Sequence, residues 1–563
     1  MNHPTETLRL EPDALSRIRS YHERSKHRHE RYAAGPDTLD WDAQPNPFRA
    51  FTDAPRIALP APGRALAAPY PALFAPGAIA TEPVNLNTLA LLLELSLGLS
   101  AWKQSGPDRW AVRCNPSSGN LRPTEAYLLC VQVPGLDDGV YHYASREHAL
   151  ELRCRTAANT ASPSAAGPAV HLALSSIHWR EAWKYGERAF RYCQLDCGHA
   201  IGALRYAAAA LGWSLQLNGA IASGQLASLL GLDRDDDFTG AEPEEAEVLL
   251  KLVPCVPGGM QIPDAVLPDT ARGIWSGRAN VLDAHPMYRW PVIDEVAKAS
   301  RKPAAASMPD AMSSQRRHVD TLPPRAGVTD LPAATLIRQR RSAQLFERSA
   351  MLEQSRFFQL LDALLPRTGV PWDGDAEPHI HVLLFVHRVA GLTPGLYALP
   401  RSAAGERQLR SALFADFTWT HIDAADQLPL YLLKQQDLSG TARMLNCSQA
   451  IASDSAFAVA MLAEFDAVLQ RAPWHYRALY REAGLAGQAL YLEAEAAGVR
   501  GTGIGCFIDD DCHALLGLTD HSFQSLYHFT VGTPQIDTRI ASLPPYPAPD
   551  ADQRSIMQTR KPT

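Results

Sequence analysis

Short hydrophobic runs separated by polar turns recur in the same order in the two halves of the chain. In the first half, Ala126–Val133 is followed by Pro134–Tyr143, and in the second half, His379–His387 is followed by Ala390–Leu399. Both following segments contain Gly-Leu, two further residues, and then Gly-Val-Tyr or Gly-Leu-Tyr, which predicts a β-hairpin in each half. A further apolar run predicts another strand after each hairpin, at Val170–Ser176 and Ala456–Leu462.

The order of elements stays the same beyond these strands. A long helix is predicted at Phe190–Leu211 and at Tyr476–Ala497, and each is followed by a glycine that can end it. Similar segments and a closing strand come next, at Leu226–Asp233 and Glu247–Val253, and at His513–Asp520 and Leu526–Val531. This recurrence predicts a duplicated domain. Without a strict βαβ alternation, we expect an α+β fold, with a mixed, largely antiparallel sheet flanked by helices in each copy.

The two domains are expected at residues 1–290 and 332–543. Residues 291–331 are rich in Pro, Ala and Ser and show no apolar periodicity, which predicts a linker or a connection wrapped over the surface. The similar composition of residues 544–563 predicts a tail.

Composition narrows the class of protein. The 563 residues are 46% hydrophobic and 20% charged, which is typical of a soluble globular protein, and the net charge of -7 argues against a nucleic-acid partner. Met1–Ser20 lacks the apolar core of a signal peptide. Thr88–Trp102 is interrupted by polar residues, so a buried helix is expected rather than a membrane span. Nine cysteines without a regular frame favour a reducing, cytoplasmic setting over a disulfide-bonded one.

Two polar segments have the chemistry of a binding site. IRQRRSAQLF places Arg340, Arg341 and Ser342 in one turn, where they could hold a phosphate, although an exposed arginine pair is the alternative. NPSSGN, at Asn115–Asn120, precedes a predicted strand. Its Pro and Gly predict a tight loop whose hydroxyls and amides could cradle a polar heterocycle, and an ordinary turn is the alternative.

A third segment, GTGIGCFIDD at Gly501–Asp510, is rich in small residues. A Rossmann phosphate loop would need a strand before the glycines and a helix beginning at them. The preceding GQALYLEAEAAG is instead helical in pattern, which excludes that motif. Small residues would let the backbone approach a flat ring. Asp509–Asp511 are expected to begin the following helix, at the positive end of its dipole.

In this order, the segments resemble motifs of the nitroreductase superfamily, close to its SagB/ThcOx-type azoline-dehydrogenase branch. RxxPSSGNxxPxE, from Arg113 to Glu125, resembles the flavin-contacting loop of that family, and Asn115–Asn120 is called the PS loop below. The resemblance implies an FMN cofactor that relatives bind between two subunits. One subunit supplies a phosphate grip and the other supplies the PS loop.

The same resemblance implies one FMN site per chain, assembled between the two halves as an intrachain pseudo-dimer. The mirror site is expected to be degraded, because PWDGDAEPH (371–379) replaces a PS loop and GWSLQLNG (212–219) replaces GTGIG. In relatives, the GTGIG segment lies along the isoalloxazine, a second phosphate-binding cation follows the last strand, and a cation often stands at the position of Gln344. The expected FMN-binding residues are Pro116, Ser117, Ser118, Asn120, Arg340, Arg341, Ser342, Gln344, Gly503, Ile504, Gly505, Cys506 and Arg539.

The resemblance also implies a catalytic pair. KYG within Arg180–Ala200 resembles the azoline-dehydrogenase branch, where a neighbouring Lys and Tyr are implicated in catalysis, and this carries over to Lys184 and Tyr185. A lysine beside a phenol would lower the cost of a phenolate, so either group could remove a proton while hydride passes to flavin N5. The alternative is the start of an amphipathic helix, with one residue solvated and the other packed.

The remaining groups are given structural interpretations. Cys193 and Cys197 share a helical face near His199, and we expect core residues there and no metal site. Cys506 is expected to pack beside the flavin, with redox sensitivity as the alternative. RSKHRHERY, at Arg24–Tyr32, is expected to be an exposed basic helix, with a phosphate grip at the mirror site as the alternative.

Three functions are compatible with these patterns. The first is an FMN-dependent oxidoreductase that transfers hydride between flavin N5 and a small or peptide-derived substrate, such as an azoline-like ring. The second is a nitro- or quinone reductase that uses NAD(P)H as a transient reductant. The third is a degenerate flavin-binding or scaffold protein in a biosynthetic complex. No nucleic-acid or membrane partner is expected, and further oligomerisation is left open.

Overall fold

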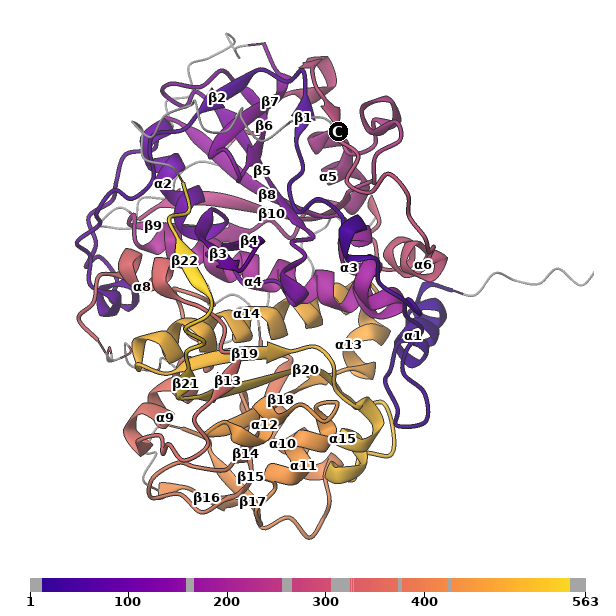
Figure 1. Cartoon of the computed structure of the whole chain (residues 1–563), viewed down its shortest axis with the longest axis vertical. Coiled ribbons are helices and arrows are strands. Elements are labelled where there is room, and N and C mark those ends of the chain that lie inside the picture. Colours follow the sequence, from indigo (N-terminus) through magenta and orange to yellow (C-terminus); the bar gives the residue numbers. More distant parts are fainter. Residues whose placement is uncertain are drawn as a thin grey trace, which may run out of the picture.

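The chain folds into two similar halves stacked on one another (Figure 1). The computed structural model describes residues 13–157, 167–255, 266–304, 322, 325, 327, 329–372, 377–423 and 428–546. Residues 1–12, most of the predicted linker, residues 373–376 and most of the predicted tail lie outside the described residues.

Each half contains an antiparallel sheet with the same strand order. The first sheet runs β6-β5-β8-β10-β9, and the second runs β15-β14-β18-β20-β19. The first set is β5 (Thr124–Val131), β6 (Gly139–Ala144), β8 (Ala169–Ser176), β9 (Trp213–Leu217) and β10 (Glu245–Pro254). The second is β14 (Ile380–Val386), β15 (Gly395–Leu399), β18 (Phe457–Glu464), β19 (Arg500–Ile504) and β20 (Phe523–Gly532). The predicted tandem α+β fold is confirmed, and the neighbouring strands in these two series pair antiparallel.

Further strands extend the outer edges of both sheets. Beyond β6 lie β7 (Ala149–Arg155), β2 (Arg56–Ala58) and β11 (Ile274–Trp275), and beyond β15 lie β17 (Tyr431–Gln435) and β16 (Thr420–His421). At the opposite edges lie β9 and β19. The sheet edge at β19 is therefore formed by the GTGIG segment, which the sequence had suggested to be a loop.

Two long helices pack against each other between the sheets (Figure 1). They are α4 (Ala189–Ala209) and α14 (His475–Ala496), and glycines allow their close approach. A Cβ atom on Gly198 would lie 2.2 Å from the carbonyl oxygen of Arg481, and one on Gly484 would lie 2.1 Å from that of Leu195. The reciprocal contact marks a pseudo-twofold relation between the halves.

Other helices cross from one half into the other. Helix α1 (Ala14–Arg24) and helix α6 (Pro291–Ala299) contribute Ile18, Tyr21, Ile293 and Val296 to the core cluster of the second half. In exchange, α8 (Ala333–Gln339) contributes Leu336 and Ile337 to the core of the first half. Residues 291–299 are therefore a packed helix, not part of a linker without structure. The domain limits at residues 290 and 332 stay predictions, because the two cores interleave across them.

The end of the chain also returns to the first half. The segment Thr88–Trp102 forms helix α2 (Leu86–Ser96) and then enters strand β3 (Leu99–Ser105), which pairs with β4 (Asp108–Arg113) and with β22 (Ala541–Leu543). The Tyr546 hydroxyl donates to the Ser145 carbonyl at 2.9 Å, so the start of the predicted tail is packed. The described residues contain no helix long and apolar enough to cross a membrane.

The remaining helices cover the sheets or connect their strands. They are α3 (His178–Tyr185), α5 (Ser223–Leu230), α9 (Gln354–Asp362), α10 (Ala403–Ala412), α11 (Ser439–Leu445), α12 (Ala450–Asp454), α13 (Asp466–Arg471) and α15 (Asp509–Leu516). Helix α15 begins at Asp509, as the sequence predicted.

The basic segment Arg24–Tyr32 does not form an exposed helix. Helix α1 ends at Arg24, and the next residues face the carboxylates that begin α15. Asp510 accepts Lys26 at 3.0 Å and Arg28 at 2.6 Å. Asp509 is buried and accepts Arg188 at 2.9 Å and Arg191 at 2.7 Å. The carboxylates at the start of α15 therefore form ion pairs that join the two halves. They also interact favourably with the positive end of the helix dipole.

We predict that Gly484→Ala weakens the contact between α4 and α14. The added methyl would overlap the Leu195 backbone, and such overpacking typically costs about 1–3 kcal/mol of folding free energy. Chemical denaturation would measure the loss. Gly224→Ala is the matched control, because Gly224 is also helical and its Cβ would meet no atom within 4 Å. Equal stability of the two variants would contradict the prediction.

Candidate functional site

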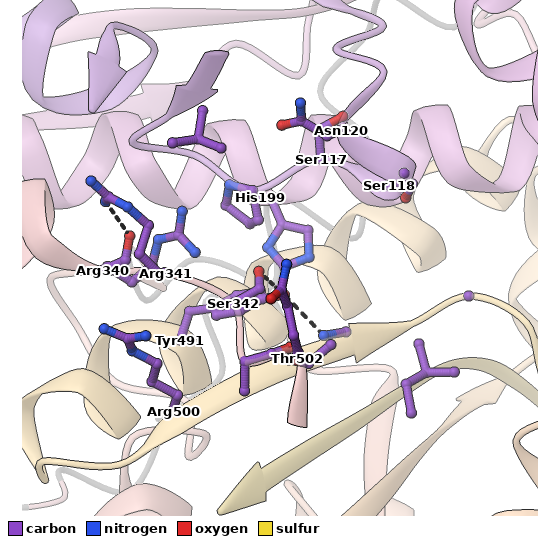
Figure 2. Close-up of a pocket in the computed structure, with 18 of the residues that line it drawn as sticks. Ser117, Ser118, Asn120, His199, Arg340, Arg341, Ser342, Tyr491, Arg500 and Thr502 are labelled. Carbon is purple, nitrogen blue, oxygen red and sulfur yellow. Dashed lines mark hydrogen bonds between the residues drawn. The ribbon is translucent and has the colours of Figure 1, made fainter. Parts of the chain in front are cut away.

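A cavity of about 710 Å³ opens between the two halves (Figure 2). The first half contributes the PS loop and residues of α3 and α4, and the second half contributes Arg340–Gln344, strand β19 and the two residues after it. A volume of this size is typical of sites for small molecules and cofactors.

Most of the residues singled out from the sequence line this one cavity. They are Pro116, Ser117, Ser118, Asn120, Tyr185, Arg340, Arg341, Ser342, Gln344, Gly503, Ile504, Gly505 and Cys506. Two do not. Lys184 lies outside the lining, and the side chain of Arg539 is 86% exposed and forms an ion pair with Asp537 at 2.8 Å. Arg500, which the sequence analysis did not single out, does line the cavity.

Positive charge gathers at one end of the cavity, where Arg340, Arg341 and Arg500 lie together (Figure 2). Lys103 also lines the cavity, and its amine donates to the Ser542 hydroxyl at 2.6 Å. Burial and the neighbouring Arg340 and Arg500 together lower the pKa of Arg341 to about 10. Burial and the same kind of repulsion, from Arg341 and Arg500, lower the pKa of Lys103. An anion bound here would relieve this repulsion.

Arg340 is buried and also fastens the two halves together. Its guanidinium donates to the carbonyls of Cys114 and Arg113 at 3.2 and 3.3 Å, just before the PS loop, and lies 5.0 Å from the centre of the Tyr491 ring. Its Nη1 has no hydrogen-bond partner among the described residues. A buried donor without a partner is costly, so a ligand oxygen would be a favourable addition here.

A buried carboxylate on helix α4 holds the PS loop in place. Asp196, on α4, accepts the Ser118 amide at 3.0 Å and the Ser118 hydroxyl at 2.9 Å. Burial raises the pKa of Asp196 to about 6, although the serine hydrogen bonds lower it. The loop needs glycine at its tip, because Gly119 has φ +56° and a Cβ there would lie 2.5 Å from the Tyr185 hydroxyl.

Small residues in GTGIG make room for aromatic side chains. A Cβ on Gly503 would lie 1.8 Å from the Tyr527 hydroxyl, and one on Gly505 would lie 2.2 Å from the Tyr192 ring. The Tyr491 hydroxyl accepts the Gly503 amide at 2.9 Å and hydrogen-bonds with Ser342 at 3.1 Å. Strand β19 therefore presents its backbone to the cavity, and tyrosine side chains pack against it.

His199 lines the same wall from α4 (Figure 2). Its Nε2 hydrogen-bonds with the Tyr527 hydroxyl at 2.9 Å, and its Nδ1 has no partner among the described residues. Burial lowers the pKa of His199 to about 3, so the ring is neutral at ordinary pH. Cys193 and Cys197 are fully buried core residues, and the described part of the chain holds no group of three or more His, Cys, Asp or Glu side chains suited to a metal.

The Lys184–Tyr185 pair does not favour a phenolate. Burial and the neighbouring Glu181 raise the pKa of Tyr185 well above its usual value. The Lys184 ammonium lies over the rings of Trp41 and Tyr185, at 5.3 Å from each centre, and burial lowers its pKa. Glu181 is fully buried, and burial raises its pKa well above the usual value. Burial from water, which the sequence does not reveal, therefore raises the pKa of Tyr185 more than the neighbouring Lys184 ammonium can lower it.

An arginine side chain bridges the two halves at the mirror position between them. Counted from the glycine contact, Arg205 occupies the place in α4 that Tyr491 occupies in α14. Its guanidinium donates to the Leu215 carbonyl on β9 at 3.1 Å and to the Pro371 carbonyl of the other half at 2.8 Å. A charged side chain thus joins the segments that would have to separate around a second ligand.

Several residues of the cavity went unnoticed in the sequence. Arg500 directly precedes GTGIG, a position that could have identified it. Lys103, Asp196 and Tyr527 are isolated residues in segments that otherwise indicate only a strand or helix, and no signal in the sequence places them together.

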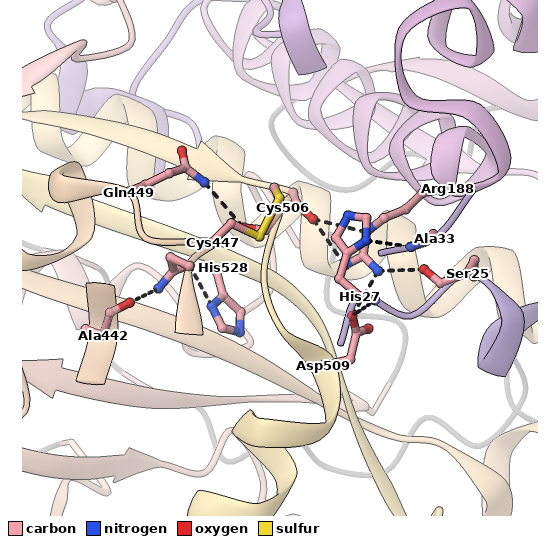
Figure 3. Close-up of a disulfide and its surroundings, with 12 residues drawn as sticks. Ser25, His27, Ala33, Arg188, Ala442, Cys447, Gln449, Cys506, Asp509 and His528 are labelled. Carbon is pink, nitrogen blue, oxygen red and sulfur yellow. Dashed lines mark hydrogen bonds and ion pairs between the residues drawn. A yellow bond between two sulfur atoms is a disulfide. The ribbon is translucent and has the colours of Figure 1, made fainter. Parts of the chain in front are cut away.

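Cys506 forms a disulfide with Cys447 (Figure 3). The sequence had favoured cysteines outside disulfides, and this expectation is wrong for Cys447 and Cys506, whereas the other seven cysteines are thiols and Cys506 lines the cavity. The two cysteines are separated by 59 residues and share no spacing motif.

Comparisons with known proteins agree with the duplicated fold. The model of the Nitroreductase family matches residues 80–241 and 337–533, which together exceed half of the chain. The chain is 24% identical over 157 residues to "Putative nitroreductase MJ1384" of Methanocaldococcus jannaschii, a match that covers 27% of this chain and 76% of that protein.

Two solved structures are also similar. One is a "putative nitroreductase" from Anabaena variabilis ATCC 29413, with TM-score 0.64 and 21% identity over 92% of this chain and 99% of that one. This likeness shows that the whole tandem fold is shared. Another, from Ralstonia eutropha JMP134, covers 40% of this chain and 92% of its own at TM-score 0.27 and 16% identity, which is too low to support an argument. By the match of the family model to both halves, the chain belongs to the nitroreductase family, a family of oxidoreductases.

Proposed function

We propose that this chain is an FMN-dependent oxidoreductase with one flavin site, assembled between its two halves. The observation that carries the proposal is the composition of the cavity between the halves. Cations of the second half occupy one end, and the PS loop of the first half lines the same space. Among the described residues, Arg340 Nη1 and His199 Nδ1 are buried without a hydrogen-bond partner, which also suits a ligand with an anionic tail and a polar ring.

Each group has a role in holding such a ligand. Lys103, Arg341 and Arg500 would bind the phosphate, and the Ser342 hydroxyl would add a hydrogen bond. The PS loop and strand β19 would enclose the ring. When bound, FMN supplies hydride chemistry at N5, which the protein side chains cannot supply. The protein orients the partners, excludes water and holds protons.

We infer that the substrate is small or peptide-derived, as in an azoline-like dehydrogenation, because Tyr185 of the KYG segment reaches the cavity wall. With its raised pKa, Tyr185 would act as a neutral hydrogen-bond donor that orients a substrate being dehydrogenated, and as a proton donor in the reductive direction, and Lys184 would position it. An NAD(P)H-dependent nitro- or quinone reductase and a scaffold protein in a biosynthetic complex are the alternatives. NADPH that bleaches the flavin would favour the reductase, and absence of flavin would favour the scaffold.

The absorbance of the purified protein, followed by release and quantification of the cofactor, tests the proposal. We expect one FMN per chain. A ratio of two would contradict a single site per chain, and a ratio of zero after incubation with FMN would contradict the proposal itself.

We predict that Arg341→Gln and Arg500→Gln weaken FMN binding by about 10- to 100-fold each, since hydrogen bonds to charged groups contribute about 1.5–3 kcal/mol. Isothermal titration of the cofactor-free proteins measures this effect. Arg539→Gln is the matched control, because that arginine is exposed and outside the cavity lining. If Arg539→Gln weakened binding as much as the other two changes, the assignment of the phosphate end would be wrong.

We predict that Tyr185→Phe leaves FMN bound but lowers turnover by about 10²- to 10⁴-fold, the range for loss of a positioned proton donor. Lys184→Gln should have a smaller effect, because this residue acts through the phenol. Flavin content and steady-state kinetics separate binding from chemistry. Unchanged turnover in both variants would reject the catalytic assignment.

Asp196 should give folding stability a distinctive pH dependence. Its folded pKa of about 6 lies above the unfolded value of about 3.9, so the unfolded chain binds fewer protons between these limits. This residue's contribution to stability should therefore decline by about 3 kcal/mol as pH rises from about 4 to about 6. Denaturation of wild type and Asp196→Asn across this interval measures the difference. A difference that does not depend on pH would show that Asp196 is not perturbed.

A further inference from the structure

The disulfide lies at the border of the proposed flavin cavity (Figure 3). Cys506 is the second residue after strand β19 and lines the cavity, whereas Cys447 lies outside the lining, in the turn between α11 and α12. Both residues are partly exposed. One sulfur atom therefore belongs to a residue of the cavity wall, and the other belongs to a partly exposed residue outside the lining, in a turn whose Gln449 also reaches the cavity.

Contacts other than the disulfide hold these two segments together. The Ile508 amide donates to the Leu445 carbonyl at 2.7 Å, and the Gln449 side chain donates to the Cys506 carbonyl at 3.3 Å. The ring of Phe507 stacks on His528, which hydrogen-bonds with Asn446 at 2.8 Å. Since these contacts flank both cysteines, the thiols of the reduced form would stay adjacent and could pair again readily. The covalent bond is thus not needed to keep the segments in place.

The other cysteines show that this pair is not part of a disulfide framework. All nine cysteines lie within the described residues, and the remaining seven are thiols. Six of those are buried, and burial raises the pKa of each: Cys114, Cys130, Cys154, Cys193, Cys197 and Cys512. A protein stapled in an oxidising compartment would pair most of its cysteines, whereas an isolated disulfide is more often catalytic or redox-sensing.

The surroundings favour exchange chemistry. The backbone is left-handed at both Cys447 (φ 51°) and Ser448 (φ 60°), and such conformations outside glycine concentrate at functional sites. Next to Cys506, the Gly505 carbonyl accepts Arg188 at 3.2 Å. Arg188 and Arg191 share the single carboxylate of Asp509, which leaves a net positive charge that would favour a thiolate.

We propose that Cys447 and Cys506 form a redox-active pair that accepts electrons from an external dithiol and delivers them to the flavin cavity. The proposal rests on the proposed function and deepens it, because it names a dithiol, small or protein-borne, as a reductant. Cys447 would face the donor, and Cys506 would face the cofactor.

Two balanced steps describe the reaction. A donor thiolate attacks the Cys447 sulfur, the bond between the two cysteines breaks, and Cys506 leaves as a thiolate. The second donor thiol then displaces Cys447 and completes the donor disulfide, so that two electrons and two protons have reached the pair. The pair then returns to the disulfide as two electrons and two protons pass to an oxidised flavin.

Thiol counting and anaerobic titration test this pair. In protein prepared without reductant, we expect alkylation after denaturation to label seven of the nine cysteines, and all nine after native incubation with dithiothreitol. Flavin-loaded wild type should take up two electrons for the flavin and two for the disulfide from dithionite, whereas Cys447→Ser and Cys506→Ser should take up only the first two. Dithiothreitol should bleach the wild-type flavin at least about 10-fold faster than that of Cys447→Ser.

Cys255→Ser is the matched control, because Cys255 is an exposed cysteine outside the cavity lining, and it should titrate like wild type. Nine labelled thiols at the start, or two-electron uptake by the wild type, would overturn the proposal even if a serine variant failed to fold. Bound flavin with either result would leave the proposed function intact. A chain that binds no flavin but changes from seven to nine thiols would contradict the proposed function, and with it the electron transfer proposed here.

Discussion

The close contact of α4 with α14 brings together everything that forms the cavity. Gly198 and Gly484 let the two backbones approach to a distance that no side chain would permit. The PS loop rests on α4 through Asp196, and strand β19 is held to α14 through Tyr491. The separation of these two walls therefore follows from the separation of the helices. Arg340 reinforces it by binding backbone of the opposite half.

Electrostatics and burial divide this cavity into two environments. At one end, Arg340, Arg341, Arg500 and Lys103 outnumber the one carboxylate that pairs with them in the described part of the chain. That carboxylate, Glu495, lies 3.7 Å from Arg500, and the excess of positive charge suits an anion. Along the rest of the wall, buried tyrosines and a neutral His199 exclude charge while offering hydrogen-bonding groups. The same burial keeps Tyr185 protonated and moves Asp196 toward neutrality. Side chains that keep their protons therefore line this part of the cavity. A bound ligand would meet little competition there from free water for its hydrogen bonds.

Local patterns in the sequence predicted most helices and strands. Contacts between distant residues determined the features that the sequence did not predict. Alternation and the Gly-Leu…Gly-x-Tyr repeat identified the hairpins, and the PS loop and Arg340–Ser342 were recognisable as motifs. GTGIG looked like a loop because glycine has little β propensity, yet pairing with β20 makes it a strand. The exchange of α1, α6 and α8 between cores, and the pairing of Cys447 with Cys506, depend on long-range packing that a short window of sequence does not contain.

Arg205 illustrates a freedom that covalent fusion of two copies provides. In a homodimer, each residue appears in both symmetry-related sites, so a side chain that blocks one site blocks the other. In this chain, the two counterparts are separate positions and can diverge independently. Arg205 bridges backbone of both halves where Tyr491 leaves a cavity. One of the two related interfaces can thus hold the halves together while the other keeps the cavity. Identical subunits cannot differ in this way.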